Sequence, residues 1–154
     1  MNEESLSRIA GTGFVKDSHI SSSCTIEGYV ESSILFSNVK VGKHARVMNS
    51  IIMNNNYIGD RAVVQNTIVC DNGEIFPRVS PNIGESARIG EDDSTGANAL
   101  YPGLIHGGVT LIGQNVEIPK GFKVSRNCFI ASSVDKGVLR SRIRMKAGDS
   151  ALKK

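Results

Sequence analysis

Apolar residues recur with a period of 17 residues from Cys24 onward. In rows of 17, the first position holds Cys24, Val41 and Ile58, with Ile75 next; the seventh holds Val30, Val47 and Val64; the thirteenth holds Phe36, Met53 and Cys70. A short repeat of this kind is typical of a solenoid, in which each repeat buries its apolar side chains only by stacking on its neighbours. We predict that each row forms one coil of three short strands, with turns of six, six and five residues, and points these side chains inward.

Stacked rows place Val41 on Ile58 and Val47 on Val64, which predicts continuous apolar columns. A helix is disfavoured because the apolar residues do not recur at a spacing of 3.6. Asparagine accepts the left-handed backbone conformation that a tight corner requires, and Asn66 follows Asn49 by one period. These features predict an all-β fold built from parallel strands.

A spacing of six apolar positions returns later in the chain, at Ile83 and Ile89 and again at Ile112, Ile118, Val124 and Ile130. Parallel strands are normally joined by right-handed crossovers. The six-residue pattern is typical of the exception, so we predict a left-handed parallel β-helix with coils of about 17 to 18 residues.

The pattern also predicts the domain boundaries. Residues 1–13 read as a leader or linker and residues 14–134 as the β-helix, with a Gly-, Asp- and Asn-rich loop over 91–111 that projects from one corner. In the basic segment 135–154, apolar and basic residues alternate over 138–146, which predicts a strand with one basic face.

Composition and charge narrow the function classes. The chain has three cysteines without CxxC spacing and no apolar run of membrane-spanning length, so we expect free buried thiols, a cytoplasmic location and no membrane partner. The net charge of +3 is concentrated in residues 135–154, which hold seven Lys and Arg against two Asp. The nearly neutral remainder argues against a nucleic-acid partner.

The sequence contains candidates for a catalytic general base and for a phosphate-binding site. His106, in the projecting loop, is the one candidate general base, whereas the spacing of His19, His44 and His106 argues against zinc, so we expect no metal or cofactor. The basic residues of the predicted late strand are candidates for binding a phosphorylated effector: Arg140, Arg142, Arg144 and Lys146. A second outward basic cluster comprises Lys40, Lys43, Arg46 and Arg61, and either cluster is alternatively a solvated surface.

Two stretches resemble a known family. Residues 20–70, with Ile-Glu-Gly, Val-Glu-Ser-Ser-Ile-Leu-Phe, Asn-Ser-Ile-Ile-Met and Ile-Gly-Asp, are similar to the C-terminal β-helix of glucose-1-phosphate adenylyltransferase, or ADP-glucose pyrophosphorylase. The stretch GGVTLIGQNVEIPKGFKVSRNC resembles the last coils of bacterial members. The resemblance implies a regulatory and assembly domain of a nucleotidyltransferase of glycogen biosynthesis, with phosphorylated metabolites as allosteric effectors.

The catalytic domain of that family has no counterpart in these residues. Gly11-Thr12-Gly13 has neither a preceding apolar strand nor a following Arg or Lys, so it does not read as a phosphate loop. We therefore expect a chain that is not catalytic alone and that has as partners a second copy of itself and a catalytic nucleotidyltransferase domain or subunit. The alternative is an acyltransferase of the same repeat class with His106 as general base.

Overall fold

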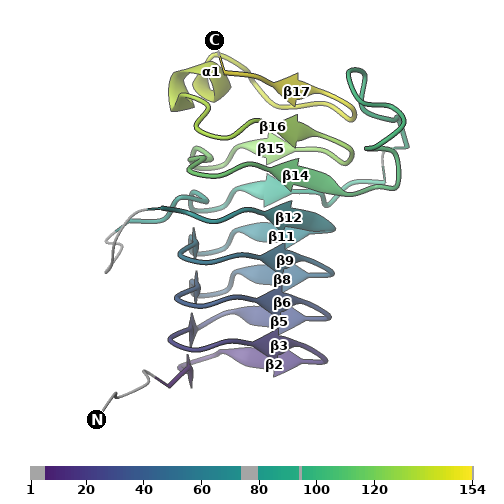
Figure 1. Ribbon diagram of the computed structural model, residues 1–154. Coiled ribbons are helices and arrows are strands. Elements are labelled where there is room, and N and C mark those ends of the chain that lie inside the picture. The colour runs from purple at the N-terminus through teal and green to yellow at the C-terminus, as the bar shows by residue number, and fades with distance from the viewer. Residues whose placement is uncertain (1–5, 74–79, 94, 154) are drawn as a thin grey trace.

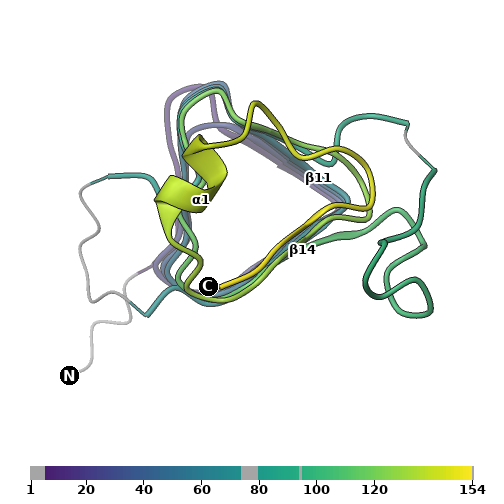
Figure 2. The ribbon, with the colours of Figure 1, turned by 90° about the horizontal axis from the view of Figure 1, so that it is seen from above.

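The protein folds as a left-handed parallel β-helix of triangular cross-section (Figures 1 and 2). A computed structural model describes residues 6–73, 80–93 and 95–153. Three parallel sheets form the three sides of the triangle; the regular coils add one strand to each sheet, and in the later coils the isolated bridges of Ile83 and Ile118 continue the side of sheet A. The predicted fold class is therefore confirmed.

The strands are short, as the spacing of the repeat requires. Sheet A contains β1 (Arg8–Ile9), β4 (Thr25–Ile26), β7 (Lys40–Val41) and β10 (Tyr57–Ile58). Sheet B contains β2 (Phe14–Lys16), β5 (Tyr29–Glu31), β8 (Arg46–Met48), β11 (Val63–Gln65), β13 (Arg88–Ile89) and β15 (Lys123–Val124). Sheet C contains β3 (His19–Ile20), β6 (Ile34–Leu35), β9 (Ile51–Ile52), β12 (Thr67–Val69), β14 (Thr110–Ile112), β16 (Phe129–Ile130) and β17 (Ser150–Ala151).

Two of the predicted inward columns are present. Val30, Val47 and Val64 pair in register along sheet B, and Val41 pairs with Ile58 in sheet A. All five side chains are completely buried. Removing an aliphatic side chain of this size from water stabilises the fold by about 1.5 to 3 kcal/mol, so the stacked columns are a main source of stability.

The third inward column was predicted wrongly by one residue. Leu35, Ile52 and Val69 point into the core and are at most 1% exposed, whereas Phe36, Met53 and Cys70 are half-buried on the outside. The five-residue turn lies between sheets B and C, because the corner residue there, Asn49 or Asn66, has positive φ and turns the chain early. Because successive strand residues point to opposite faces, a shift of one position exchanges inside for outside.

The first column also needs correction. Val41 pairs with Ile26 and not with Cys24, although Cys24 is buried. The turn between Ile26 and Val30 is two residues shorter than the equivalent turn between Val41 and Val47, so a constant period fails there. Ile75 lies outside the described residues, and Ile83 is the residue that bridges to Ile58.

The two ends differ from the predicted boundaries. β1 belongs to sheet A, so the segment expected to be a leader already contributes a strand. The predicted strand over 138–146 is replaced by helix α1 (Lys136–Arg140), which Asp135 caps by accepting a hydrogen bond from the Gly137 N–H at 2.6 Å. α1 lies at the C-terminal end of the stack, where its Leu139 joins the core with 0% exposure (Figures 1 and 2).

Residues 91–93 and 95–109 lie outside the stack, between β13 and β14, and project from one corner (Figure 2). The buried side chain of Asn98 anchors this loop: its amide donates to the Asn127 carbonyl at 3.1 Å, and its oxygen accepts from the Leu100 and Tyr101 N–H groups at 3.0 Å. The loop is therefore a fixed part of the fold. Among the described residues, no helix has the length and apolar character needed to cross a membrane.

Candidate functional site

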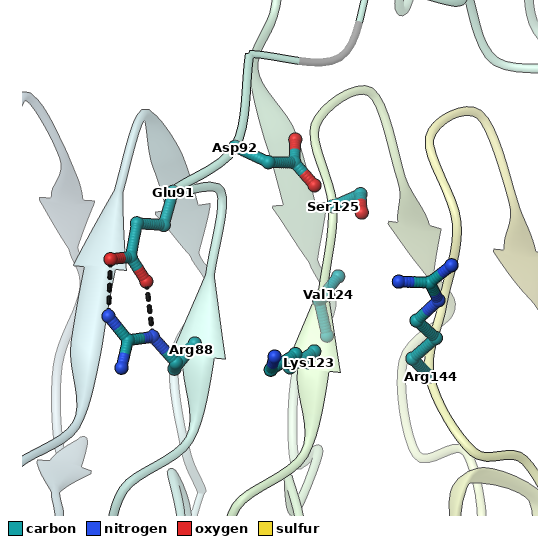
Figure 3. Close-up of a pocket in the computed structure, with 7 residues that line it drawn as sticks. All are labelled: Arg88, Glu91, Asp92, Lys123, Val124, Ser125 and Arg144. Atoms are coloured by element: carbon teal, nitrogen blue, oxygen red, sulfur yellow. Dashed lines mark hydrogen bonds and ion pairs between the residues drawn. The ribbon is translucent and has the colours of Figure 1, made fainter.

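A pocket of about 340 Å³ lies on the outer surface of sheet B, where the projecting loop begins (Figure 3). Three cations line it: Arg88 on β13, Lys123 on β15 and Arg144 on the next coil. They share one outward position of the repeat, because Arg88 pairs with Lys123 and the neighbouring residues Val124 and Met145 bridge the last two coils. Adjacent strands are about 4.8 Å apart, so the three charges converge on one small region.

Two carboxylates from the start of the loop also line the pocket. Glu91 forms a bidentate ion pair with the Arg88 guanidinium, and this hydrogen bonding lowers the pKa of Glu91. Asp92 accepts a hydrogen bond from the Arg126 N–H at 3.4 Å. Glu91 therefore remains ionised at neutral pH and neutralises Arg88.

Lys123 and Arg144 are the cations available to a ligand. Both are exposed, and within the part of the chain that the structure describes neither has a carboxylate within ion-pair distance. Figure 3 shows Arg144 on the coil next to the one that carries Lys123 and Ser125, with the Arg88–Glu91 pair on the other side of that coil. A guanidinium offers a two-pronged donor and an ammonium a point charge, a combination that suits a phosphate group.

Of the four predicted effector-binding residues, only Arg144 lines this pocket. Arg140 ends α1, Arg142 is half-buried, and Lys146 follows Met145 with its N–H donating to Asp149 Oδ2 at 2.9 Å. Their expected common face depended on a period-two strand. Helix α1 ends at Arg140, and the turn and bends over 141–143 leave Arg142 and Arg144 outside any strand, so the alternation is absent.

The second basic cluster does not form one site either. Lys40 lies over the Tyr57 ring at 4.7 Å and Arg46 over the Tyr29 ring at 5.6 Å, on different sheets. Arg61 pairs with Glu85 at 3.6 Å. These cations are therefore engaged with neighbouring side chains or separated from one another.

Sequence reasoning missed Arg88 and Lys123, although a signal was present. Each directly precedes an inward aliphatic residue, Ile89 or Val124, just as Arg144 precedes the buried Met145. Aligning the later hexapeptides by their inward residues would have placed the three cations in one column.

His106, the candidate general base, lies exposed on the projecting loop and is not part of the pocket lining. The described residues contain no cluster of three or more His, Cys, Asp or Glu side chains arranged to hold a metal ion. The lining of the sheet B pocket offers charge for binding an anion and no paired nucleophile and base.

The chain is similar to several proteins that carry the same name, glucose-1-phosphate adenylyltransferase. The chain is 39% identical over 145 residues to a glucose-1-phosphate adenylyltransferase of Pseudothermotoga lettingae, covering 94% of this chain and 32% of that protein. It is 30% identical over 127 residues to the enzyme of the same name from Acetivibrio thermocellus, covering 79% of this chain and 26% of that protein. The chain thus spans a third or less of the length of these relatives, and the similar part is their C-terminal region.

A family model provides the assignment. The model described as GlmU-like, C-terminal hexapeptide matches residues 6–112, which is more than half of the chain. The matched range includes the regular coils and extends through the projecting loop to the end of β14. The chain belongs to the family of GlmU-like C-terminal hexapeptide domains.

Proposed function

We propose that this chain is the regulatory and assembly domain, or an accessory subunit, of an ADP-glucose-forming nucleotidyltransferase, and that the sheet B pocket binds a phosphorylated metabolite. The observation that carries the proposal is the pair of unneutralised cations, Lys123 and Arg144, in a pocket of the β-helix. Similarity of most of the chain to the C-terminal region of glucose-1-phosphate adenylyltransferases supports the choice of enzyme.

The chemistry of the pocket supports a small dianion as ligand. Lys123 and Arg144 supply two positive charges on adjacent coils, Glu91 is paired with Arg88, and Asp92, the second carboxylate of the lining, accepts a hydrogen bond from the Arg126 backbone N–H. An open site of this kind binds weakly and loses affinity as salt screens its charges, since the Debye length falls to about 8 Å at physiological ionic strength. A ligand bound at the sheet B pocket would affect nucleotidyl transfer only by changing the conformation or activity of the catalytic domain or subunit.

The test is calorimetric or NMR titration with fructose 1,6-bisphosphate at low and at physiological salt. We expect a Lys123→Ala/Arg144→Ala variant to bind at least about tenfold more weakly than the parent chain, which corresponds to about 1.4 kcal/mol. The matched control is Arg140→Ala/Arg142→Ala, which removes the same charge outside the pocket and should change affinity less than about twofold. Equal losses in both variants would show that only the overall charge matters.

The regulatory and assembly roles need a second experiment. We expect the chain to co-purify with a co-expressed glucose-1-phosphate adenylyltransferase catalytic polypeptide, and the Lys123→Ala/Arg144→Ala variant to co-purify equally well. In that complex, fructose 1,6-bisphosphate should change the rate of nucleotidyl transfer when the parent chain is present and should leave the rate unchanged when the variant is present. Failure of the parent chain to associate would refute the assembly role, and an unchanged response in the variant would refute the regulatory role of the pocket.

A further inference from the structure

The Glu91 carboxylate occupies the position on Arg88 that an anionic ligand of the sheet B pocket would take. Both carboxylate oxygens accept hydrogen bonds from the Arg88 guanidinium, which uses the same two-pronged donor set that binds phosphate. Figure 3 shows this pair on one side of Lys123 and Arg144 on the other. The pocket therefore contains a row of three cations, one of which already binds an internal anion.

The projecting loop is held by residues other than Glu91. The Asn127 side chain donates to the Gly96 carbonyl at 3.0 Å and accepts from the Gly108 N–H at 2.7 Å, in addition to the Asn98 hydrogen bonds described above. Among the residues that the structure describes, the Glu91 carboxylate forms hydrogen bonds with Arg88 alone. The Glu91 side chain can therefore leave Arg88 without breaking a bond that anchors the loop.

The cations of sheet B hold Glu91 by the same forces that would attract a ligand. Hydrogen bonds from Arg88 lower the pKa of the Glu91 carboxyl, and the charges of Lys123 and Arg46 lower it as well. Glu91 is therefore a full anion at neutral pH. A ligand phosphate that approaches Arg88 competes directly with this carboxylate.

The pair is exposed enough to exchange partners. The side chains of Arg88 and Glu91 are 51% and 37% exposed, and an ion pair in contact with water contributes little to stability because solvent screens it. A phosphate group carries about −1.5 to −2 charges at neutral pH and offers three acceptor oxygens. Phosphate can therefore replace Glu91 on Arg88 when the rest of the ligand is already bound nearby.

The spacing of the row suits a ligand with two anionic groups. Arg88 and Lys123 are paired on adjacent strands, and the bridge between Val124 and Met145 places Arg144 one coil further along the stack. Two strand spacings amount to about 10 Å, so the two ends of the row can bind two groups of one small molecule. A ligand with one anionic group needs only Lys123 and Arg144 and leaves Glu91 in place.

We propose that Glu91 is a specificity-determining residue of the sheet B pocket: an internal anion that a second phosphate group of the ligand displaces from Arg88. The ligand class that follows is a small metabolite with two phosphate groups, which binds more tightly than its counterpart with one. The inference rests on the function proposed above, because Lys123 and Arg144 bind the first phosphate. It adds Arg88, which is neutralised in the free chain, as a contact in the complex.

Calorimetric titration with fructose 1,6-bisphosphate and with fructose 6-phosphate at low salt tests the proposal. We expect the parent chain to bind the bisphosphate at least about tenfold more tightly than the monophosphate. The decisive variant is Arg88→Ala/Glu91→Ala, which removes both members of the pair and leaves the net charge unchanged. It should bind the bisphosphate at least about fivefold more weakly than the parent, and the monophosphate within about twofold of the parent.

The matched control is Lys136→Ala/Glu117→Ala, which removes another exposed ion pair, with 3.5 Å between Lys136 Nζ and Glu117 Oε2, outside the pocket lining. Both of its affinities should remain within about twofold of the parent. A further variant, Glu91→Gln, keeps the size of the side chain and removes the competing charge, so it should bind the bisphosphate more tightly than the parent. In the parent, the NMR signal of the Arg88 Nε–H group should shift on addition of the bisphosphate and stay in place on addition of the monophosphate.

Three results would overturn the inference: equal affinity of the parent for the two ligands, an unchanged bisphosphate affinity in Arg88→Ala/Glu91→Ala, or the same loss in the control variant. If the parent binds neither sugar phosphate, the function proposed above fails as well. If the parent binds both equally and Lys123→Ala/Arg144→Ala binds neither, the phosphate site stands and the role of Glu91 is refuted.

Discussion

The coils between β4 and β12 and the coils after them share one interior and differ at their corners. In the first region, 17 residues separate Val47 from its partner Val64, and single residues with positive φ, such as Asn49 and Asn66, form the corners. In the second region, 25 residues separate Val64 from Ile89 and 35 separate Ile89 from Val124. The inward side chains remain apolar throughout.

The difference separates the residues that determine the fold from those that provide the candidate site. The regular coils repeat their inward residues, and their outward cations Lys40, Arg46 and Arg61 contact neighbouring side chains. The later coils place Arg88 and Lys123 next to a loop whose first residues, Glu91 and Asp92, complete the pocket. The candidate site therefore lies where the chain departs from the repeat, above a core that continues beneath it.

The largest effect should follow from a charge inside the regular stack. Val64 is 0% exposed between Val47 and Ile89, so Val64→Asp would bury an unpaired carboxylate and cost about 4 kcal/mol or more. We expect loss of the cooperative thermal transition, measured by circular dichroism. The adjacent Val63 points outward, and Val63→Asp should lower stability by less than about 1 kcal/mol. A soluble, normally melting Val64→Asp variant would contradict the register.

A smaller and local effect is expected in the irregular region. Asn98→Ala removes the side chain that accepts from the Leu100 and Tyr101 N–H groups and donates to the buried Asn127 carbonyl, and the loss of these bonds should cost about 1 to 3 kcal/mol. Hydrogen exchange should accelerate over residues 96–109 while amides of β9 and β12 keep their protection. Equal acceleration in both regions would show that loop and core are one cooperative unit.

The smallest effect concerns a thiol in the later coils. Burial raises the pKa of Cys128 from its ordinary value of 9.0 to about 11. The folded state therefore holds this proton more tightly than the unfolded chain, and the resulting stability is complete below pH 9 and is lost as the pH rises toward 11. Denaturant unfolding at pH 8 and pH 10.5 should show a loss that is about 1 to 2 kcal/mol greater in the parent than in Cys128→Ala. Equal losses would exclude the contribution.

The period of 17, together with the six-residue spacing later in the chain, was sufficient to predict the fold class and the columns through Val47 and Val41. It failed where three consecutive apolar residues, Ile51, Ile52 and Met53, left two inward choices. The choice depends on where the corner falls, which is set by the backbone at Asn49 and not by hydrophobicity. The period of the apolar residues alone therefore does not determine whether Ile52 or Met53 points inward.

The candidate site was predicted less well, because it combines residues distant in the sequence. Arg144 was expected in a strand with Arg140 and Arg142, but the C-terminal end of the core requires a cover, and α1 provides it with Leu139. Lys123 reaches Arg144 only through the stacking of successive coils. Local alternation in one segment does not reveal such a column.

The tolerance of the corners for long insertions suggests a use for this molecule in protein engineering. Closing a flexible loop costs only about 0.6 kcal/mol more for each doubling of its length, so an inserted segment at a corner adds little to the free energy of folding. Residues 91–93 and 95–109 already occupy one corner while Ile89 and Val124 remain paired beneath them. Foreign peptides grafted at the corners around Asn49 and Asn66 would be displayed on adjacent coils, with attachment points about 4.8 Å apart.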